Sequence, residues 1–330
     1  MEDVMMDHLL AYFSVSGVKT WVFVPPMVAF IISVVTSMGG VSGAFLLLPF
    51  QMSFLGYTHP SVSATNQFFN IVAIPSGVYR YRKEGRMLWS LTWVIIAGTL
   101  PGVFMGAVIR IAYLPDPGKF KLFAGAVLLY LGFKMIRDLL KMKNPGGGEN
   151  GGAEKRFQVL ARGFRGKSSQ AFDRSDPLPA IKTTRFNLKR LEYTFYGERF
   201  EIPIWAILAL SFLVGVVGGV YGVGGGAFIA PFLVTFLGLP VYTVAGASLM
   251  GTFVTSIAGV AFYHCIAPFY PGMSVAPDWA LGMLFGLGGS AGMYMGARWQ
   301  KFVPAWIIKW ILAAVIVFTA VKYVAAFFGL

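Results

Sequence analysis

The chain has 330 residues, of which 56% are hydrophobic, 16% aromatic and only 12% charged, with a mean hydropathy of +0.68. A soluble domain carries about 25% charged residues, so this composition excludes one and indicates an integral membrane protein. The net charge of +13 raises the question of a nucleic-acid partner, and a single cysteine, Cys265, excludes an intrachain disulfide and a cysteine-based metal cluster.

Hydrophobic residues fall into blocks of about 17–25 residues, the length at which a helix crosses about 30 Å of hydrocarbon. The blocks lack the alternation of a membrane β-barrel, so the sequence predicts an all-α integral membrane protein. Residues 1–20 contain Glu2, Asp3 and Asp7 before any apolar run, so we expect an uncleaved interfacial lead-in rather than a secretory signal. The ten predicted segments are 21–37, 39–56, 61–79, 88–110, 119–136, 203–219, 222–238, 242–263, 278–297 and 304–326.

Basic residues are concentrated in two places. The stretch from Lys134 to Arg199 contains 15 of the 27 lysines and arginines, and a second cluster lies at 80–87. The positive-inside rule places both stretches in the cytoplasm, where they meet anionic lipid, so we expect membrane lipids and no nucleic acid as partners. Loop 264–277 has no lysine or arginine and is predicted to be external, like both termini, whereas 298–302 is predicted to be cytoplasmic.

The second half of the chain repeats the first. A shift of 182 residues aligns GVSG at 40–43 with GVGG at 222–225, and Pro49-Phe50 with Pro231-Phe232. At a slightly larger shift, GVFMGA at 102–107 meets GMYMGA at 292–297. The chain is therefore predicted to be a duplication of five segments plus five.

An odd number of crossings per repeat places the two copies upside down relative to each other, which predicts two inverted repeats of the kind found in secondary transporters. The second segment of each repeat, 39–56 and 222–238, is short, begins with glycines and contains a proline. These features favour a short or interrupted helix at membrane depth, with an ordinary short helix as the alternative. We divide the chain into a lead-in at 1–20, a first membrane repeat at 21–136, a cytoplasmic basic loop at 137–201 and a second membrane repeat at 202–330.

The basic loop at 137–201 has two parts. Residues 143–155, KNPGGGENGGAEK, have the composition of a flexible linker. Residues 185–202 are rich in aromatic and β-prone residues, which predicts a small hairpin or interfacial flap, with a disordered basic linker as the alternative.

Five glycines occur in GVYGVGGGAF, residues 219–228, within the most apolar part of the chain. A phosphate-binding loop of the Walker type ends in Gly-Lys-Ser or Gly-Lys-Thr, but this run is followed by apolar residues without a lysine, so nucleotide binding is disfavoured. Two interpretations stay open. Gly218, Gly222 and Gly226 form a close-packing helix face, or the run makes a turn that leaves N–H groups free to bind an anion.

The stretch GVYGVGGGAFIAPFLVTFLGLPVYTVAGASLMGTFVTSIAG, residues 219–259, resembles the signature half of the TauE/SafE sulfite exporter family, also called the 4-toluenesulfonate uptake permease superfamily. The resemblance covers both hydrophobic halves of the chain. It implies transport of small sulfur-containing or organic anions, such as sulfite, sulfonates or sulfoacetate, across a bacterial inner membrane. The first half departs from the pattern with GGVSGAFLLLPF at 39–50 and SVSATNQFFN at 61–70, which affects the identity of the substrate more than the fold.

Polar residues that follow the two glycine runs are the candidate anion ligands. Asn66 and Asn70 are spaced i, i+4 on one helix face, and Ser248 and Thr252 take the equivalent positions in the second half. Neutral amides and hydroxyls donate hydrogen bonds to sulfonate oxygens without the cost of burying a charge; hydrogen bonding between helices is the alternative role. The predicted substrate-binding residues are Gly40, Gly43, Asn66, Gln67, Asn70, Gly222, Gly224, Gly225, Gly226, Ser248 and Thr252.

The predicted segments are expected to hold no aspartate or glutamate for a proton relay, and the chain has only three histidines. We therefore predict a non-enzyme that needs no cofactor or metal. Together with these absences, the resemblance to the TauE/SafE family implies export of a small sulfur-containing anion by a multi-pass inner-membrane transporter, with the anion bound near the midplane between the repeats. An inside-negative potential favours this export by about 2.3 kcal/mol per 100 mV for a monovalent anion. An anion channel or a membrane scaffold without coupled transport is the alternative, and a homodimer stays open.

Overall fold

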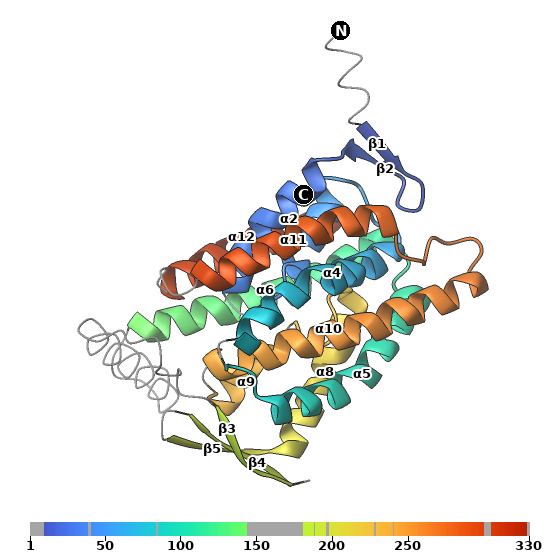
Figure 1. Cartoon of the computed structure of the whole chain (residues 1–330). Helices are drawn as coiled ribbons and strands as arrows, with labels where there is room; N and C mark the ends of the chain where they lie inside the picture. Colours follow the sequence, from blue (N-terminus) through green and yellow to red (C-terminus); the bar gives the residue numbers. More distant parts are fainter. Residues whose placement is uncertain are drawn as a thin grey trace.

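The computed structural model describes residues 10–38, 41–83, 85–143, 181–187, 189–195, 198–227, 229–239, 241–299 and 305–328. In this part of the chain, ten α-helices form a bundle, and two small sheets lie at opposite ends of it (Figure 1). The helices are α2 (Val24–Met38), α3 (Ala44–Ser53), α4 (Ser61–Lys83), α5 (Trp89–Ala112), α6 (Pro117–Lys143), α8 (Ile204–Tyr221), α9 (Ile229–Leu237), α10 (Val241–Ile266), α11 (Trp279–Trp299) and α12 (Ala305–Phe328).

The prediction of a mostly helical protein with several apolar helices is confirmed. Among the residues that the structure describes, three helical stretches are long and apolar enough to cross a membrane by length and composition: Trp89–Ala112, Ile204–Tyr221 and Thr243–Phe269. The second helix of each half is much shorter, since α3 has 10 residues and α9 has 9. At 1.5 Å per residue these helices are about 14–15 Å long, which is about half the thickness of the hydrocarbon core.

In the described part of the chain, two small antiparallel sheets accompany the helices. Strands β1 (Leu10–Phe13) and β2 (Val18–Trp21) form a hairpin at the end of the predicted lead-in. Strands β3 (Lys182–Phe186), β4 (Arg190–Phe195) and β5 (Glu198–Pro203) form a three-stranded sheet in the order β3-β4-β5. The linker at 143–155, apart from Lys143, lies outside the described residues.

The alternation of side chains in β4 explains why this segment forms a strand. Leu191, Tyr193 and Phe195 are buried, while the intervening positions are less buried, as expected when successive side chains point to opposite faces. The buried face packs toward the bundle, where the hydroxyl of Tyr193 lies 3.1 Å from that of Thr243 at the start of α10. The sheet is therefore attached to the membrane helices through a specific contact.

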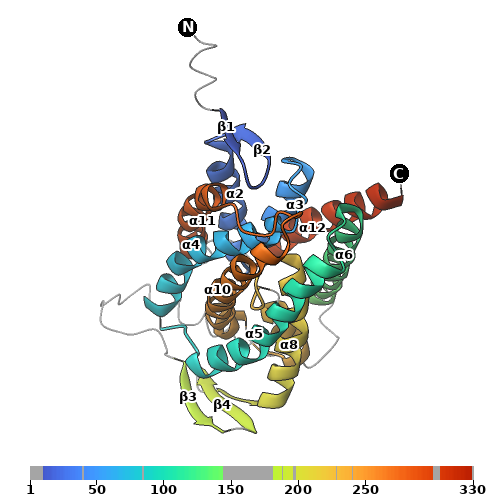
Figure 2. The same ribbon diagram turned by 90° about the vertical axis from the view of Figure 1, so that its right-hand side faces the viewer.

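Two pairs of helices are built in the same way, and Figure 2 shows α5 beside α8 and α2 beside α11. A Cβ atom at Gly102 of α5 would lie 2.5 Å from the carbonyl oxygen of Phe212, and one at Gly292 of α11 would lie 2.4 Å from that of Phe30. Side chains would force both pairs apart, so glycine permits the close approach. Equivalent contacts occur one turn earlier and one turn later, at Gly98 and Gly106 in α5 and at Gly288 and Gly296 in α11.

The third helices of the two halves, α4 and α10, pack against each other in opposite directions. Near the start of α10, a Cβ atom at Gly246 would lie 3.4 Å from the Cβ atom of Tyr81, near the end of α4. Toward the end of α10, Gly259 packs directly against the side chain of Gln67, near the start of α4. This antiparallel pair places the polar face of α4 against the polar face of α10.

Candidate functional site

The glycine run after α8 forms a non-helical turn before α9 begins. Gly222 caps α8 in the left-handed conformation with a φ of 81°, and Gly224 has a φ of 77°. Residues with a Cβ atom adopt this conformation only at a cost, so these two positions require glycine for the backbone. Position 225 requires glycine for a different reason, namely space, because a Cβ atom there would lie 2.4 Å from the Cβ atom of Thr99 on α5.

The glycines of this run do not form one packing face, although the sequence leaves that interpretation open. A Cβ atom at Gly218 would meet the carbonyl oxygen of Gly224 in the turn itself, at 2.5 Å. One at Gly222 would lie 2.4 Å from the Cα atom of Ser63 on α4, and one at Gly226 would lie 2.4 Å from the carbonyl oxygen of Ser248 on α10. The turn is therefore packed tightly between α4, α5 and α10.

The equivalent turn in the first half precedes α3. Gly40 lies outside the described residues, while Gly43 is the residue before α3 and has an ordinary helical φ of −58°. A Cβ atom at Gly43 would lie 2.5 Å from the Oγ atom of Ser33, so Gly43 is required for space rather than for an unusual backbone conformation.

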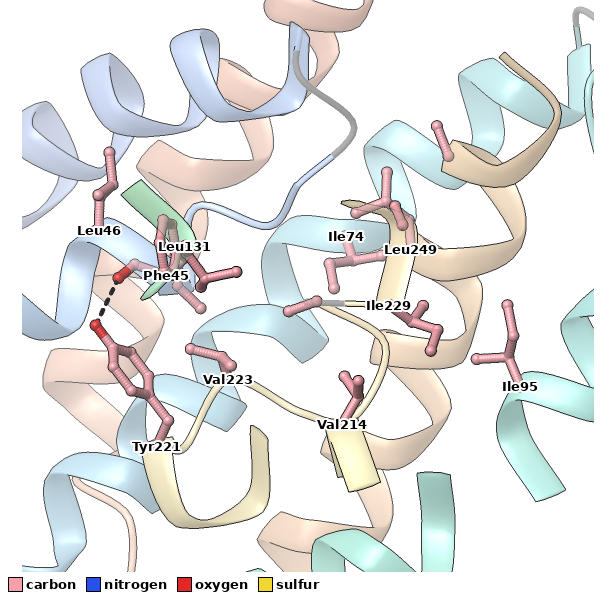
Figure 3. Packing of buried hydrophobic residues seen from close by; sticks show 14 of the residues in the cluster. Phe45, Leu46, Ile74, Ile95, Leu131, Val214, Tyr221, Val223, Ile229 and Leu249 are labelled. Carbon is pink, nitrogen blue, oxygen red and sulfur yellow. Dashed lines mark hydrogen bonds between the residues drawn. The ribbon is translucent and has the colours of Figure 1, made fainter. Parts of the chain in front are cut away.

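Asn70 of α4 joins the two turns. Its amide nitrogen donates to the carbonyl oxygen of Val223, in the second turn, at 2.9 Å, and to the hydroxyl of Ser256 at 3.3 Å. Its amide oxygen accepts a hydrogen bond from the hydroxyl of Ser42, in the first turn. The hydroxyl of Tyr221 makes a further link, donating to the carbonyl oxygen of Phe45 at 3.1 Å (Figure 3). The two glycine turns therefore meet at one place.

The remaining predicted residues surround this meeting point. The amide nitrogen of Asn66 donates to the carbonyl oxygen of Ala44 at 2.9 Å, and the hydroxyl of Thr252 donates to the carbonyl oxygen of Ser248 at 2.8 Å. The N–H group of Gly225 donates to the hydroxyl of Thr255 at 3.1 Å. Many of these donors are thus used within the protein, in line with the alternative role of hydrogen bonding between helices.

Several buried polar atoms on α4 and α10 have no hydrogen-bond partner. They include the amide oxygen of Asn66, both amide atoms of Gln67 and the hydroxyl of Ser248, and these three side chains are at most 1% exposed. An unsatisfied buried polar group costs about 1–3 kcal/mol, so their retention suggests a ligand or water. Of these three side chains, Gln67 and Ser248 retain an N–H and an O–H group that could donate to a ligand.

The surroundings of these polar groups are apolar. Figure 3 shows Phe45, Val223 and Ile229 near the two turns, with Ile74, Leu249 and Ile95 on the neighbouring helices. The half-helices α3 and α9 both begin here, and a helix N-terminus carries about half a positive charge. The arrangement offers donors and positive potential in a region of low polarity, which suits a small anion better than a cation.

The expectation that the segments hold no acidic residue is wrong at one position. Asp278, which is 3% exposed, precedes the first residue of α11 and accepts hydrogen bonds from the N–H groups of Ser16 and Leu281, both at 3.1 Å. Both carboxylate oxygens are therefore used in capping α11 and fixing the β1–β2 hairpin. In the described part of the chain, no group of three or more histidine, cysteine or acidic residues is arranged to hold a metal.

Three contributors to the site were not selected from the sequence. Ser42 and Tyr221 lie within the two glycine motifs and join the turns, and Thr99 of α5 packs against Gly225. Ser42 aligns with Gly224 under the 182-residue shift. The sequence signal for Ser42 was therefore that the first half has a polar residue where the second half has a glycine. Thr99 has no local signal, since its role depends on how α5 packs against the turn.

The chain is similar to known membrane transport proteins. The family model described as "Sulfite exporter TauE/SafE" matches residues 26–323. A "Probable membrane transporter protein YdhB" of Bacillus subtilis (strain 168) is 28% identical over 115 residues, which cover 35% of this chain and 44% of that protein. "Sulfite exporter TauE/SafE family protein 6" of Arabidopsis thaliana is 32% identical over 92 residues, 28% of this chain and 20% of that protein. The matches thus span less than half the length of either relative, and no solved structure matches the chain.

Proposed function

Because the chain belongs to the TauE/SafE sulfite exporter family, and is therefore a membrane transporter, we propose that it exports a small sulfur-containing anion, such as sulfite or an organosulfonate, from the cytoplasm. We assign it to the bacterial inner membrane. The family description and the name of the Arabidopsis relative support the choice of substrate. Under this proposal the protein binds the anion and moves it without covalent chemistry.

The meeting of the two glycine turns is the observation that carries the proposal. The amide of Gln67, which packs against Gly259 of α10, and the hydroxyl of Ser248, a residue that borders Gly226 of the second turn, are buried without hydrogen-bond partners, so they are the groups we assign to the anion. Asn66 and Asn70 hold the turns in place, because their amide nitrogens donate to the carbonyl oxygens of Ala44 and Val223. The starts of α3 and α9 add positive potential.

We also propose that the two halves, 21–136 and 202–330, are inverted repeats that move relative to each other around this site. Three contacts support this. The helices α4 and α10 occupy equivalent places in the two halves and run antiparallel, and the glycine contacts of α5 with α8 recur between α11 and α2. The linked turns lie between the halves, where alternating access requires the substrate to be held.

The anion needs no coupled proton to leave an inside-negative cell, because the potential favours expulsion of a monovalent anion by about 2.3 kcal/mol per 100 mV. A channel would use the same driving force, so a carrier and a channel would move the anion in the same direction. They differ in that a carrier can exchange an anion on one side of the membrane for an anion on the other. The tightly packed turns, linked by Asn70 and Tyr221, support a carrier, since a continuous pore needs no such closed centre.

Purified protein in liposomes tests the proposal. We expect uptake of radiolabelled sulfite that is inhibited by unlabelled sulfite or by methanesulfonate, with no uptake of sodium ions or glucose. Counterflow separates the two mechanisms, because a carrier accumulates labelled anion in exchange for unlabelled anion inside the liposomes, while a pore does not. Transport of cations or sugars without transport of any sulfur oxyanion would refute the assignment.

A further inference from the structure

A fully buried arginine lies in the last turn of α5. The side chain of Arg110 is 0% exposed, and its guanidinium donates to the carbonyl oxygen of Thr58 at 3.0 Å and to that of Leu114. The ring of Phe120 covers it, with the ring centre 3.7 Å from the Cζ atom. The Nε–H group has no partner, and in the described residues Arg110 forms no ion pair with a carboxylate.

A second buried group with an unused donor lies next to this arginine. Tyr263 of α10 is 0% exposed and belongs to one buried cluster with Ala107 and Ile111, the residues of α5 that flank Arg110, and its hydroxyl forms no well-aligned hydrogen bond. Guanidinium nitrogens only donate, and a phenol hydroxyl has one hydrogen to donate. Arg110 and Tyr263 therefore present a permanent positive charge and two unused donors in the same buried place, which are the properties of an anion site.

This place adjoins the candidate site. A Cβ atom on Gly222, the first residue of the second turn, would lie 2.4 Å from the Cα atom of Ser63. The hydroxyl of Ser63 itself faces the carbonyl oxygen of Val220 at 3.5 Å. Ser63 thus touches the glycine turn on one side and lies close to Tyr263 on the other, so Ser63 and Tyr263 together separate the turn from the buried charge of Arg110.

A comparable pair occurs at the opposite end of the antiparallel helices α4 and α10. The guanidinium of Arg86, which is 5% exposed, lies 4.8 Å from the ring centre of Tyr81. Tyr81 and Tyr263 are related by the same 182-residue shift that aligns the two glycine turns. Each end of the α4–α10 pair therefore has a buried tyrosine with an arginine beside it.

We propose that Arg110 and Tyr263 form a second anion-binding site, in which the transported anion is held between the glycine turns and the end of the bundle where α4 begins. This inference rests on the proposed function. The anion serves there as the counter-ion that the protein does not provide for Arg110. Arg86 and Tyr81 occupy the corresponding position at the other end.

The competing role for Arg110 is purely structural. Its two hydrogen bonds to backbone carbonyl oxygens tie the end of α5 to the loops before α4 and α6. Under this role, loss of the side chain lowers stability and leaves anion binding unchanged in the folded protein. The two roles therefore differ in a measurable way.

The test measures the half-saturating concentration of radiolabelled sulfite in liposomes, from each side of the membrane, together with the unfolding temperature of each purified variant. Arg110→Gln removes the charge and keeps an N–H group that can donate to a backbone carbonyl oxygen, whereas Arg110→Lys retains an ammonium group. Tyr263→Phe removes a hydroxyl that has no well-aligned hydrogen bond, so it should leave the unfolding temperature unchanged. Arg298→Gln, at an exposed position at the end of α11, is the matched control for loss of one positive charge.

We expect Arg110→Gln to raise the half-saturating concentration by about tenfold or more, and Tyr263→Phe by about threefold to tenfold. The Arg298→Gln control should stay within about twofold of the unchanged protein, because it leaves the buried charge in place. Arg110→Lys should lie between the control and Arg110→Gln, because lysine supplies an ammonium group but not the planar set of donors or the stacking on Phe120. Unchanged half-saturation in Arg110→Gln and Tyr263→Phe, with sulfite transport intact, would overturn this inference alone. If the unchanged protein transports neither sulfite nor methanesulfonate, the proposed function and the inference both fail.

Discussion

Replacing Asn70 by leucine should destabilise the protein more than the same change at Asn66. Asn70 makes three hydrogen bonds, to Val223, to Ser256 and from Ser42, whereas Asn66 makes one, to the carbonyl oxygen of Ala44. At about 1 kcal/mol for each bond, Asn70→Leu should lower the free energy of unfolding by about 3 kcal/mol and Asn66→Leu by about 1 kcal/mol. These losses correspond to decreases in the unfolding temperature of about 6–12 °C and about 2–4 °C.

Thermal unfolding of the two purified variants in the same detergent, followed by the tyrosine and tryptophan signal, measures this difference. Sulfite binding to the folded fraction should change little in either variant, because both amide nitrogens are already used within the protein. The reasoning would be refuted if Asn70→Leu kept the unfolding temperature of the unchanged protein while losing its affinity for sulfite. That result would mean that the Asn70 amide contacts the anion instead of joining the turns.

Three further predictions concern packing, pH and topology. Gly292→Ala places a Cβ atom 2.4 Å from a carbonyl oxygen of α2 and should cost about 1–3 kcal/mol of stability, measured by thermal unfolding against a Gly272→Ala control at an open position. Burial raises the pKa of Tyr193 above its usual value, so the folded state keeps the proton when the unfolded chain loses it near pH 10; stability should fall above about pH 10, and less steeply in Tyr193→Phe. In a background with Cys265→Ser, an impermeant thiol reagent should label Tyr270→Cys but not Arg82→Cys in intact cells, and the reverse pattern would contradict the predicted orientation.

The helices of this protein are readable from the sequence because each depends on a local run of apolar residues. The short α3 and α9 follow from glycine and proline at 39–56 and 222–238, and β4 follows from alternation within 190–195. The hydrogen bond of Asn70 to Val223 joins residues 153 positions apart, so no local pattern indicates it. Which donors are used and which are left for a ligand is decided by such contacts between the halves.

The buried charges were missed for a related reason. Asp278 and Arg110 lie at the edges of apolar segments, where charged residues normally contact water or lipid headgroups. Their burial results from the packing of the β1–β2 hairpin and of the loop at 54–60 over these edges, as the contacts to Ser16 and Thr58 show. A segment boundary in the sequence does not indicate whether another part of the chain covers it.

The affinity of Gln67→Met for sulfite tests the central claim most directly. Both amide atoms of Gln67 are buried without a partner, so the nearly isosteric change removes no hydrogen bond within the protein and should not lower the unfolding temperature. Gln51 of α3 is equally buried and also lacks partners, so Gln51→Met is the matched control outside the proposed site. We predict that Gln67→Met weakens sulfite binding by about tenfold while Gln51→Met leaves it unchanged; equal and unchanged affinity in both variants would contradict a binding site at the two glycine turns.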